Sequence, residues 1–339
     1  LEPLGAFIRE SRAEEPRIDG SSYSDSLYLD ALVLLENLIR EERWHDAIRC
    51  AEIVYLHAQE GNNFIERKQI LNAGLRAAIE LKDEFGQTSI LIELADTVVQ
   101  QNELNEAEEI LKRSLNLARS NKNVEHEVKI IDRLANLFND MDNHAKAFYF
   151  RQQAVSLLGS IDNKGIQFET LANFGVALVR LRYGQPKQAI SLLQSALQIA
   201  INENNTYPIA RIYHFLGVAL TAAQNEEEAI VSLRNALKFA EQNRQKIWEL
   251  RAKSKLGNIY LMQGQVENAR LCYSEARKLA ITLDDRLAHA ANSGNLGTVY
   301  EELGDKKEAV KYLREALNIF EENNAEQAQI TRDRINKLL

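Results

Sequence analysis

The side chains that could do acid–base, nucleophilic or metal chemistry in this chain are 49 acidic residues, six histidines and two cysteines. No two histidines have the four-residue separation of a helical zinc pair, and Cys50 lies far from Cys272. The sequence also lacks the Gly-x-x-x-x-Gly-Lys-Ser/Thr loop that cradles phosphates. Adjacent acids such as Glu226, Glu227 and Glu228 are typical of a solvated turn and helix start. We therefore predict no enzyme activity, no metal site and no cofactor.

Composition limits the classes of partner. The formal net charge is −8 at pH 7, which disfavours a general nucleic-acid surface because such surfaces need net positive charge. Two cysteines without a partner motif are typical of a reducing, intracellular setting. No apolar run approaches the roughly 18 residues of a membrane span. We expect a cytoplasmic protein that binds neither nucleic acid nor a membrane.

Small residues recur along the chain at nearly constant spacing. The first series is Ala95, Ala135, Gly175, Gly217, Gly257 and Gly297, and the second is Ala107, Ala147, Ala189, Ala229, Ala269 and Ala309. Members of the first series lie 40 residues apart, or 42 where Tyr183–Pro186 lengthen a turn. Small side chains let antiparallel helices cross closely, and large apolar residues recur between them at helical spacing. Pro is absent between Pro16 and Pro186, so this stretch is predicted to be helix after helix.

The box Leu256-Gly257-x-x-Tyr260, followed by Ala269, a large residue and Ala276, resembles the tetratricopeptide repeat. The resemblance covers about residues 85–320. The period is stretched from 34 to 40 residues, and the family's early Trp and closing Pro are absent. This longer variety is similar to repeats of kinesin light chains, Leu-Gly-Asn spindle-orientation proteins and sensor regions of bacterial signalling NTPases. The resemblance implies an all-α fold, a right-handed α-solenoid of antiparallel helix hairpins with about 16 helices.

Regularity divides the chain into four segments. Residues 1–21 are predicted to be a linker or extended segment, 22–84 irregular N-terminal repeats, 85–322 six regular repeats and 323–339 a capping helix. In the irregular segment we predict helices over about 25–42, 44–60 and 64–83, and the cap over about 324–338. The helix opening at Trp44 resembles the degenerate repeat after the nucleotide-binding module of bacterial NB-ARC or NACHT-type ATPases. The opening Leu1 suggests a piece of a longer protein.

The same resemblance indicates candidate binding residues, because in this family the first helix of each pair lines a concave groove. At the corresponding positions the two ends of the row carry the acids Glu93, Asp96, Glu301 and Glu302, whereas its middle carries the candidates Lys129, Arg133, Asn173, Arg180, Arg211, His214, Arg251, Lys255 and Asn258. Most are basic, against the acidic trend of the chain, which favours an acidic or otherwise anionic partner. The alternative is a solvated polar face in which arginines pair with carboxylates along and between neighbouring helices.

Three residues near this row need separate expectations. Arg251 and Lys255 resemble half of the family's clamp for chaperone C-termini, but Phe215 stands where the clamp has Asn, so such tails are not expected ligands. Trp248 is expected to pack or to edge the groove. Asn258 either contacts a peptide backbone, as Asn does in related longer repeats, or is structural.

Two functions follow from the resemblance. The first is a module that binds a peptide or protein in its concave groove and acts in signalling, as the C-terminal sensor of a bacterial STAND-type protein does. The second is a constitutive scaffold or assembly factor in a multiprotein complex, without switching. One conformation with and without the partner would favour the scaffold.

Overall fold

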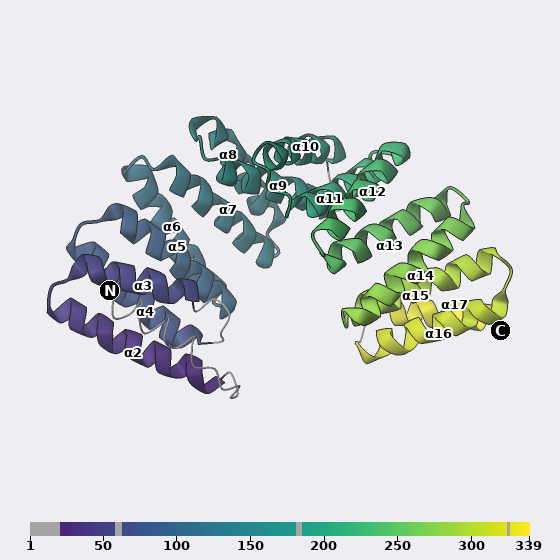
Figure 1. Ribbon diagram of the computed structural model, residues 1–339, viewed down its shortest axis with the longest axis horizontal. Coiled ribbons are helices and arrows are strands. Elements are labelled where there is room, and N and C mark those ends of the chain that lie inside the picture. Colours follow the sequence, from purple (N-terminus) through teal and green to yellow (C-terminus); the bar gives the residue numbers. More distant parts are fainter. Residues whose placement is uncertain (1–20, 58–62, 181–184, 324–325) are drawn as a thin grey trace. The chain divides into compact units, whose positions relative to one another are not determined.

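The computed structural model describes residues 21–57, 63–180, 185–323 and 326–339 (Figure 1). Within these ranges the chain forms sixteen α-helices and one 3-10 turn, with no strand, which confirms the predicted all-α class. The chain divides into two compact units, residues 1–166 and 167–339, and each is described by itself.

The helices of the N-terminal unit follow one another through short turns. They are α2 (Ser21–Arg40), α3 (Trp44–His57), α4 (Phe64–Glu80), α5 (Glu84–Gln100), α6 (Leu104–Ser120), α7 (Val124–Asp140) and α8 (His144–Leu157), followed by η1 (Leu158–Ser160). Sequential helices from α3 to α7 pack against one another, as do α7 and α8.

The C-terminal unit repeats the same arrangement. Its helices are α9 (Lys164–Arg180), which begins just before the division, α10 (Pro186–Asn202), α11 (Ile209–Ala222), α12 (Glu226–Gln242), α13 (Lys246–Met262), α14 (Val266–Thr282), α15 (Arg286–Glu302), α16 (Lys306–Glu322) and α17 (Gln327–Leu338). From α5 to α16 we call the odd-numbered helix of each pair the first helix and the even-numbered one the second helix.

Most turns between helices share one backbone device. A residue just past the helix adopts a left-handed conformation, as Asn102 does with φ 61°, and the next amide donates back to a carbonyl of the last turn. Only Gly264 and Gly304 among these residues are glycines, although glycine favours this region. Several following helices are then capped, as when the Asp305 carboxylate accepts from the Glu308 amide.

The small residues of the first series lie where paired helices cross. A Cβ built on Gly217 would stand 2.6 Å from Leu233 Cγ, and one on Gly257 would stand 2.6 Å from the Tyr273 ring. Gly175 meets Leu193, and Gly297 meets Leu313, in the same way. The large residue of the second helix therefore occupies the space that a side chain on the first helix would need.

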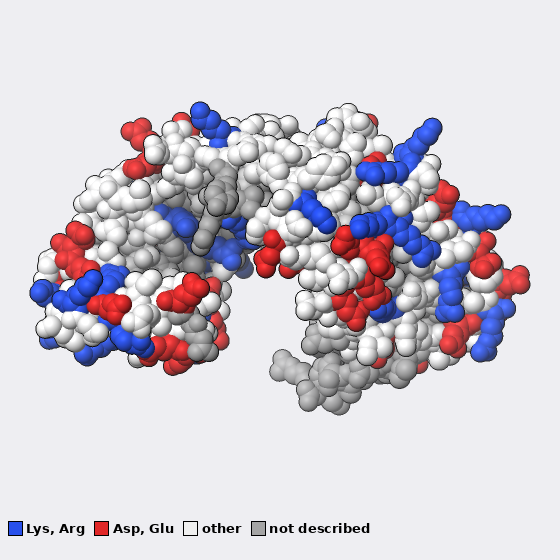
Figure 2. All heavy atoms as spheres, turned by 180° about the vertical axis from the view of Figure 1, so that it is seen from behind, with Lys and Arg blue, Asp and Glu red and all other residues white. Residues whose placement is uncertain are grey.

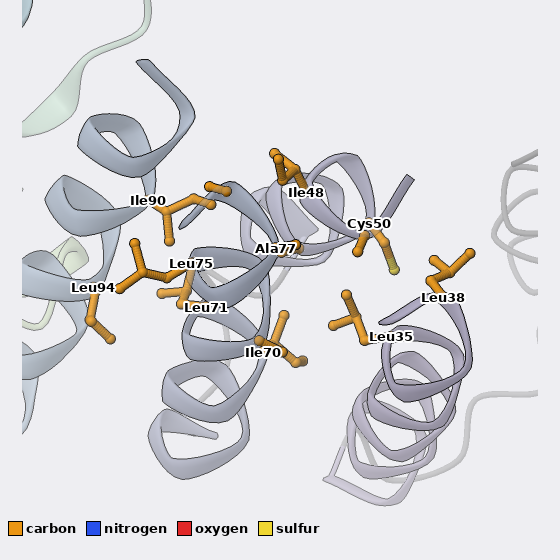
Figure 3. Packing of buried hydrophobic residues seen from close by; sticks show 14 of the residues in the cluster. Leu35, Leu38, Ile48, Cys50, Ile70, Leu71, Leu75, Ala77, Ile90 and Leu94 are labelled. Atoms are coloured by element: carbon orange, nitrogen blue, oxygen red, sulfur yellow. The ribbon is translucent and has the colours of Figure 1, made fainter. Parts of the chain in front are cut away.

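The N-terminal unit has a continuous apolar core (Figure 3). Leu35 and Leu38 of α2 lie beside Cys50 of α3, and Ile70 of α4 packs into the same cluster, which continues to Leu94 of α5. Burial raises the pKa of the Cys50 thiol to about 11, so this cysteine is an inert apolar group. The irregular N-terminal helices thus bury a core of the same kind as the regular repeats.

Helix ends differ from the expected ones in this unit. α2 runs from Ser21 to Arg40 and α4 ends at Glu80, whereas helices were predicted over about 25–42 and 64–83. The chain turns earlier because Glu42 and Lys82 take left-handed conformations, which neither residue type signals in a sequence. Residues 1–20 of the predicted linker, and the turn insertion at 183–184, lie outside the described residues.

None of the helices described here combines the length and the apolar character that crossing a bilayer requires.

The crossing at Gly297 generates a stability prediction. Gly297→Ala should lower the free energy of unfolding of the C-terminal unit by about 1–3 kcal/mol, because its Cβ would lie 2.7 Å from Leu313 Cγ. Gly294→Ala in the same helix should instead raise it by about 0.5–1 kcal/mol, since its Cβ has no neighbour nearer than 3.9 Å. Urea unfolding followed by circular dichroism measures both. Equal destabilisation by the two variants would contradict the crossing argument.

Candidate functional site

The nine candidate residues all lie on first helices, and the two units share them unequally. Lys129 and Arg133 are on α7 of the N-terminal unit. The C-terminal unit holds Asn173 and Arg180 on α9, Arg211 and His214 on α11, and Arg251, Lys255 and Asn258 on α13. Each set is considered within its own unit.

Of the two candidates of the N-terminal unit, Arg133 matches the alternative of a paired polar face, whereas Lys129 has no ion pair among the described residues. The Arg133 guanidinium lies 3.3 Å from the Asp96 carboxylate of α5, and both side chains are partly exposed. Lys129 lies near His126, whose pKa falls below its ordinary value through burial and then through this lysine. The positive charge of Arg133 is therefore already balanced by a neighbouring first helix.

The candidates of the C-terminal unit behave differently. Within the described residues none of the four cations Arg180, Arg211, Arg251 and Lys255 forms an ion pair with a carboxylate. Other cations of the unit do, as Arg334 of α17 shows by donating to Glu301 at 2.8 Å. We call these four cations together with His214 the basic cluster. Figure 2 shows basic side chains in the recess of this unit, seen on the left, and mixed charges on its outer surface.

Two aromatic rings support the guanidinium groups of the basic cluster. Arg180 Cζ lies 5.6 Å from the centroid of the Phe215 ring, and Arg251 Cζ lies 4.8 Å from that of Trp248. The two rings meet edge to face at 6.0 Å between centroids. Cation–π contacts at these distances hold a guanidinium over a ring face while its N–H edge stays available. We call Phe215 and Trp248 the aromatic pair.

His214 lies beneath these cations. It is only 5% exposed, its ring centroid is 5.6 Å from that of Trp248, and its Nδ1 has no hydrogen-bond partner among the described residues. Burial, followed by the charges of Lys255 and Arg251, lowers its pKa to about 3. The ring is therefore neutral at pH 7, with one nitrogen that donates and one that accepts.

Arg211 of α11 lies close enough to Arg180 of α9 and Arg251 of α13 to be affected by the charges of both. It is half-buried, and its pKa is lowered by burial first, then by the charges of Arg180 and Arg251. Like charges at this range repel, and no carboxylate among the described residues offsets them. A bound anion would relieve this repulsion, so the cluster is suited to an anionic ligand.

The two asparagine candidates are less clearly suited to ligand binding than the basic cluster. The Asn258 side-chain oxygen accepts a hydrogen bond of 2.8 Å from the Tyr273 hydroxyl of the second helix α14. Its amide nitrogen alone is available to a ligand. Asn173 is half-buried on α9 and has no hydrogen bond to another described residue.

Sequence reasoning missed the aromatic pair as part of this site. Trp248 was expected to be packing or a groove edge, and Phe215 was considered only because it replaces an asparagine. A signal was present, because Phe215 follows Arg211 by four residues and Trp248 precedes Arg251 by three. Such spacings place side chains on one face of a helix.

No group of three or more His, Cys, Asp or Glu side chains with metal-binding geometry occurs in the described parts of the chain.

Family models match the segments that carry the basic cluster except for Arg180, which lies outside both. The tetratricopeptide-repeat description applies to residues 210–243 and to residues 248–322. Residues 210–243 and 248–322 are tetratricopeptide repeats. The first segment contains Arg211 and His214, and the second contains Arg251 and Lys255. No curated protein matches this chain in sequence.

Solved structures with low sequence identity share the fold. One is a STAND signal-transduction ATPase with a tetratricopeptide repeat sensor from Pyrococcus horikoshii, with TM-score 0.66, 17% identity and 93% of this chain covered. This chain spans 49% of that protein's length. A Rap protein complexed with competence and sporulation factor has TM-score 0.51 and 15% identity, covering 93% of this chain and 98% of its own. The APC/C hetero-tetramer Cut9–Hcn1 has TM-score 0.56 and 16% identity, covering 94% and 57%.

The neutral His214 ring generates a pH prediction. Its folded pKa of about 3 lies below the ordinary value of about 6.5, so the fold favours the uncharged ring. The stability that depends on this uncharged ring is fully present above about pH 6.5 and is lost as pH falls toward 3. Between pH 6 and 5 the wild type should therefore lose about 1 kcal/mol more than His214→Gln.

Trp44→Phe leaves Trp248 as the only tryptophan, so fluorescence-detected urea unfolding of this background reports the C-terminal unit. Parallel stability curves for the two proteins from pH 7 to 5 would contradict a neutral, buried His214.

Proposed function

We propose that this chain is a non-catalytic interaction module that binds an acidic or otherwise anionic segment of a protein partner at the basic cluster. The observation that carries the proposal is that four cations on three successive first helices have no carboxylate partner among the described residues. Unbalanced charge of one sign in a recess attracts and orients a ligand of the opposite sign.

The paired polar face accounts for other parts of the chain but not for this one. Asp96 of α5 pairs with Arg133 of the first helix α7, and Glu301 of α15 pairs with Arg334 of the last helix α17, so neighbouring helices supply acids to both cations. Arg211 and Arg251 stand at equivalent positions of successive repeats, and Glu169 of α9 stands at the equivalent position before them, yet no ion pair joins Glu169 to Arg211 among the described residues. Arg133 and Arg334 are thus balanced by acids of neighbouring helices, whereas the four cations gathered in the basic cluster are not, which supports binding there.

We further propose that the module acts in signalling, as a sensor of its partner. The STAND protein with a tetratricopeptide repeat sensor supports this role, because nearly all of this chain shares its fold with about half of that protein. The competing role is a constitutive scaffold, which the shared fold of Cut9–Hcn1 equally allows. The roles differ in whether binding changes the conformation of the module.

Charge reversal tests the binding proposal. The triple variant Arg211→Glu, Arg251→Glu, Lys255→Glu should weaken capture of the partner by about 100-fold or more, because attraction becomes repulsion at each position. A binding titration with the captured partner measures this, after circular dichroism has shown that the helices are intact.

The matched control is Lys238→Glu, Lys278→Glu, Lys307→Glu. These lysines are exposed on second helices, and the variant carries the same change in net charge. It should bind as the wild type does. Equal loss in both triple variants would indicate a general charge effect and would overturn the assignment of the site.

Hydrogen exchange separates the sensor from the scaffold. For a sensor, the partner should change amide exchange at least several-fold in helices outside α9–α13 as well as protecting those helices. A scaffold should show protection confined to the contacted helices. Mass spectrometry of the free and bound chain gives the answer, and confined protection would contradict the signalling role.

A further inference from the structure

We infer that the anionic group recognised by the basic cluster is a phosphate monoester on a side chain of the protein partner, rather than a carboxylate. This inference rests on the proposed binding function and deepens it. It concerns the α9, α11 and α13 helices of the C-terminal unit only.

The first argument for a phosphate is the number of positive charges that no carboxylate balances. None of the four cations of the basic cluster forms an ion pair with an acid among the described residues. A carboxylate brings one negative charge and two acceptor atoms, whereas a phosphate monoester brings about −1.5 to −2 charges at pH 7 and three strong acceptor oxygens. The dianion therefore matches the charge of the site more closely than a single Asp or Glu does.

The orientation of the cations carries the second step. The faces of Arg180 and Arg251 rest on Phe215 and Trp248, so the side chains are held in place before a ligand arrives. A guanidinium presents paired N–H groups at its edge, which suit two oxygens of one phosphate. Because the groups are already positioned, little conformational entropy is lost when the anion binds.

His214 carries the third step. Its buried Nδ1 has no hydrogen-bond partner among the described residues, and a polar atom left in this state costs free energy. The neutral ring adds no charge but supplies a hydrogen-bond donor or acceptor to a ligand held by Arg211 and Arg251. Because Nδ1 is itself buried, a hydrogen bond from this atom to a ligand oxygen requires the ring to turn toward the cations on binding.

The aromatic pair favours a phosphorylated side chain over a nucleotide. A nucleobase needs an open ring face on which to stack. Phe215 is 6% exposed and His214 5% exposed, while the Trp248 ring is in contact with Arg251, His214 and Phe215. The rings are therefore used to hold cations and offer little surface to a base.

The experiment compares probes that differ only in the anion. Three degenerate peptide libraries carry phosphoserine, glutamate or serine at one fixed central position, and AMP and inorganic phosphate are added as separate probes. Binding is followed by Trp248 fluorescence in the Trp44→Phe protein and by calorimetry. The phosphoserine library should bind at least about tenfold tighter than the glutamate library, and the serine library should bind most weakly.

Variants connect this preference to the cluster. Arg251→Gln with Lys255→Gln should remove the preference for phosphoserine, while the outer-surface control Lys238→Gln with Lys278→Gln should keep it. Equal affinity for phosphoserine and glutamate libraries would overturn the phosphate inference and leave the proposed function intact. Tighter binding of AMP than of the phosphoserine library would also overturn it, by assigning the site to a free nucleotide. If none of the probes binds, the phosphate inference is overturned. If the triple charge-reversal variant still captures the partner, the proposed function is overturned as well.

Discussion

The close crossing of two helices at a small residue is the constraint on which the rest of this structure depends. The first helices carry a glycine at positions 175, 217, 257 and 297. A large residue of the second helix fills the space that a side chain at each position would occupy. Because the crossing recurs about every 40 residues, neighbouring helix pairs within each unit stack in nearly the same register. A repeat protein gains stability in this way from neighbouring contacts alone, so the outward positions of the first helices are free to vary.

That freedom explains how the basic cluster arises. Arg211 and Arg251 occupy equivalent positions of successive repeats, so the stacking that buries the core also brings two cations together. The aromatic pair then keeps the guanidinium groups from turning away from one another, at contacts within about 6 Å. The N-terminal unit differs, because there the charge of Arg133 on α7 is balanced by Asp96 on the preceding first helix α5.

The spacing of small residues in the sequence was enough to predict helix pairs and their crossings, and the family resemblance supplied the row of candidate residues. It could not show which cations are paired, because Arg133 and Asp96 are 37 residues apart and their meeting depends on how two helices stack. The ring contacts of Phe215 and Trp248 were missed for the same reason. The ends of α2 and α4 were not predicted because Glu42 and Lys82, just past them, adopt left-handed conformations without a glycine signal.

Photo-crosslinking tests most directly the claim that a partner lies on the first helices of the C-terminal unit. Ala291 of α15 is exposed and stands 40 residues after Arg251, at the equivalent position, so a benzoylphenylalanine there leaves the basic cluster intact. Lys278 of the second helix α14 is the control position. We expect cross-links from position 291 to acidic or phosphorylated peptides of the partner, and none from position 278. Partner cross-links from position 278 with none from position 291 would contradict the account.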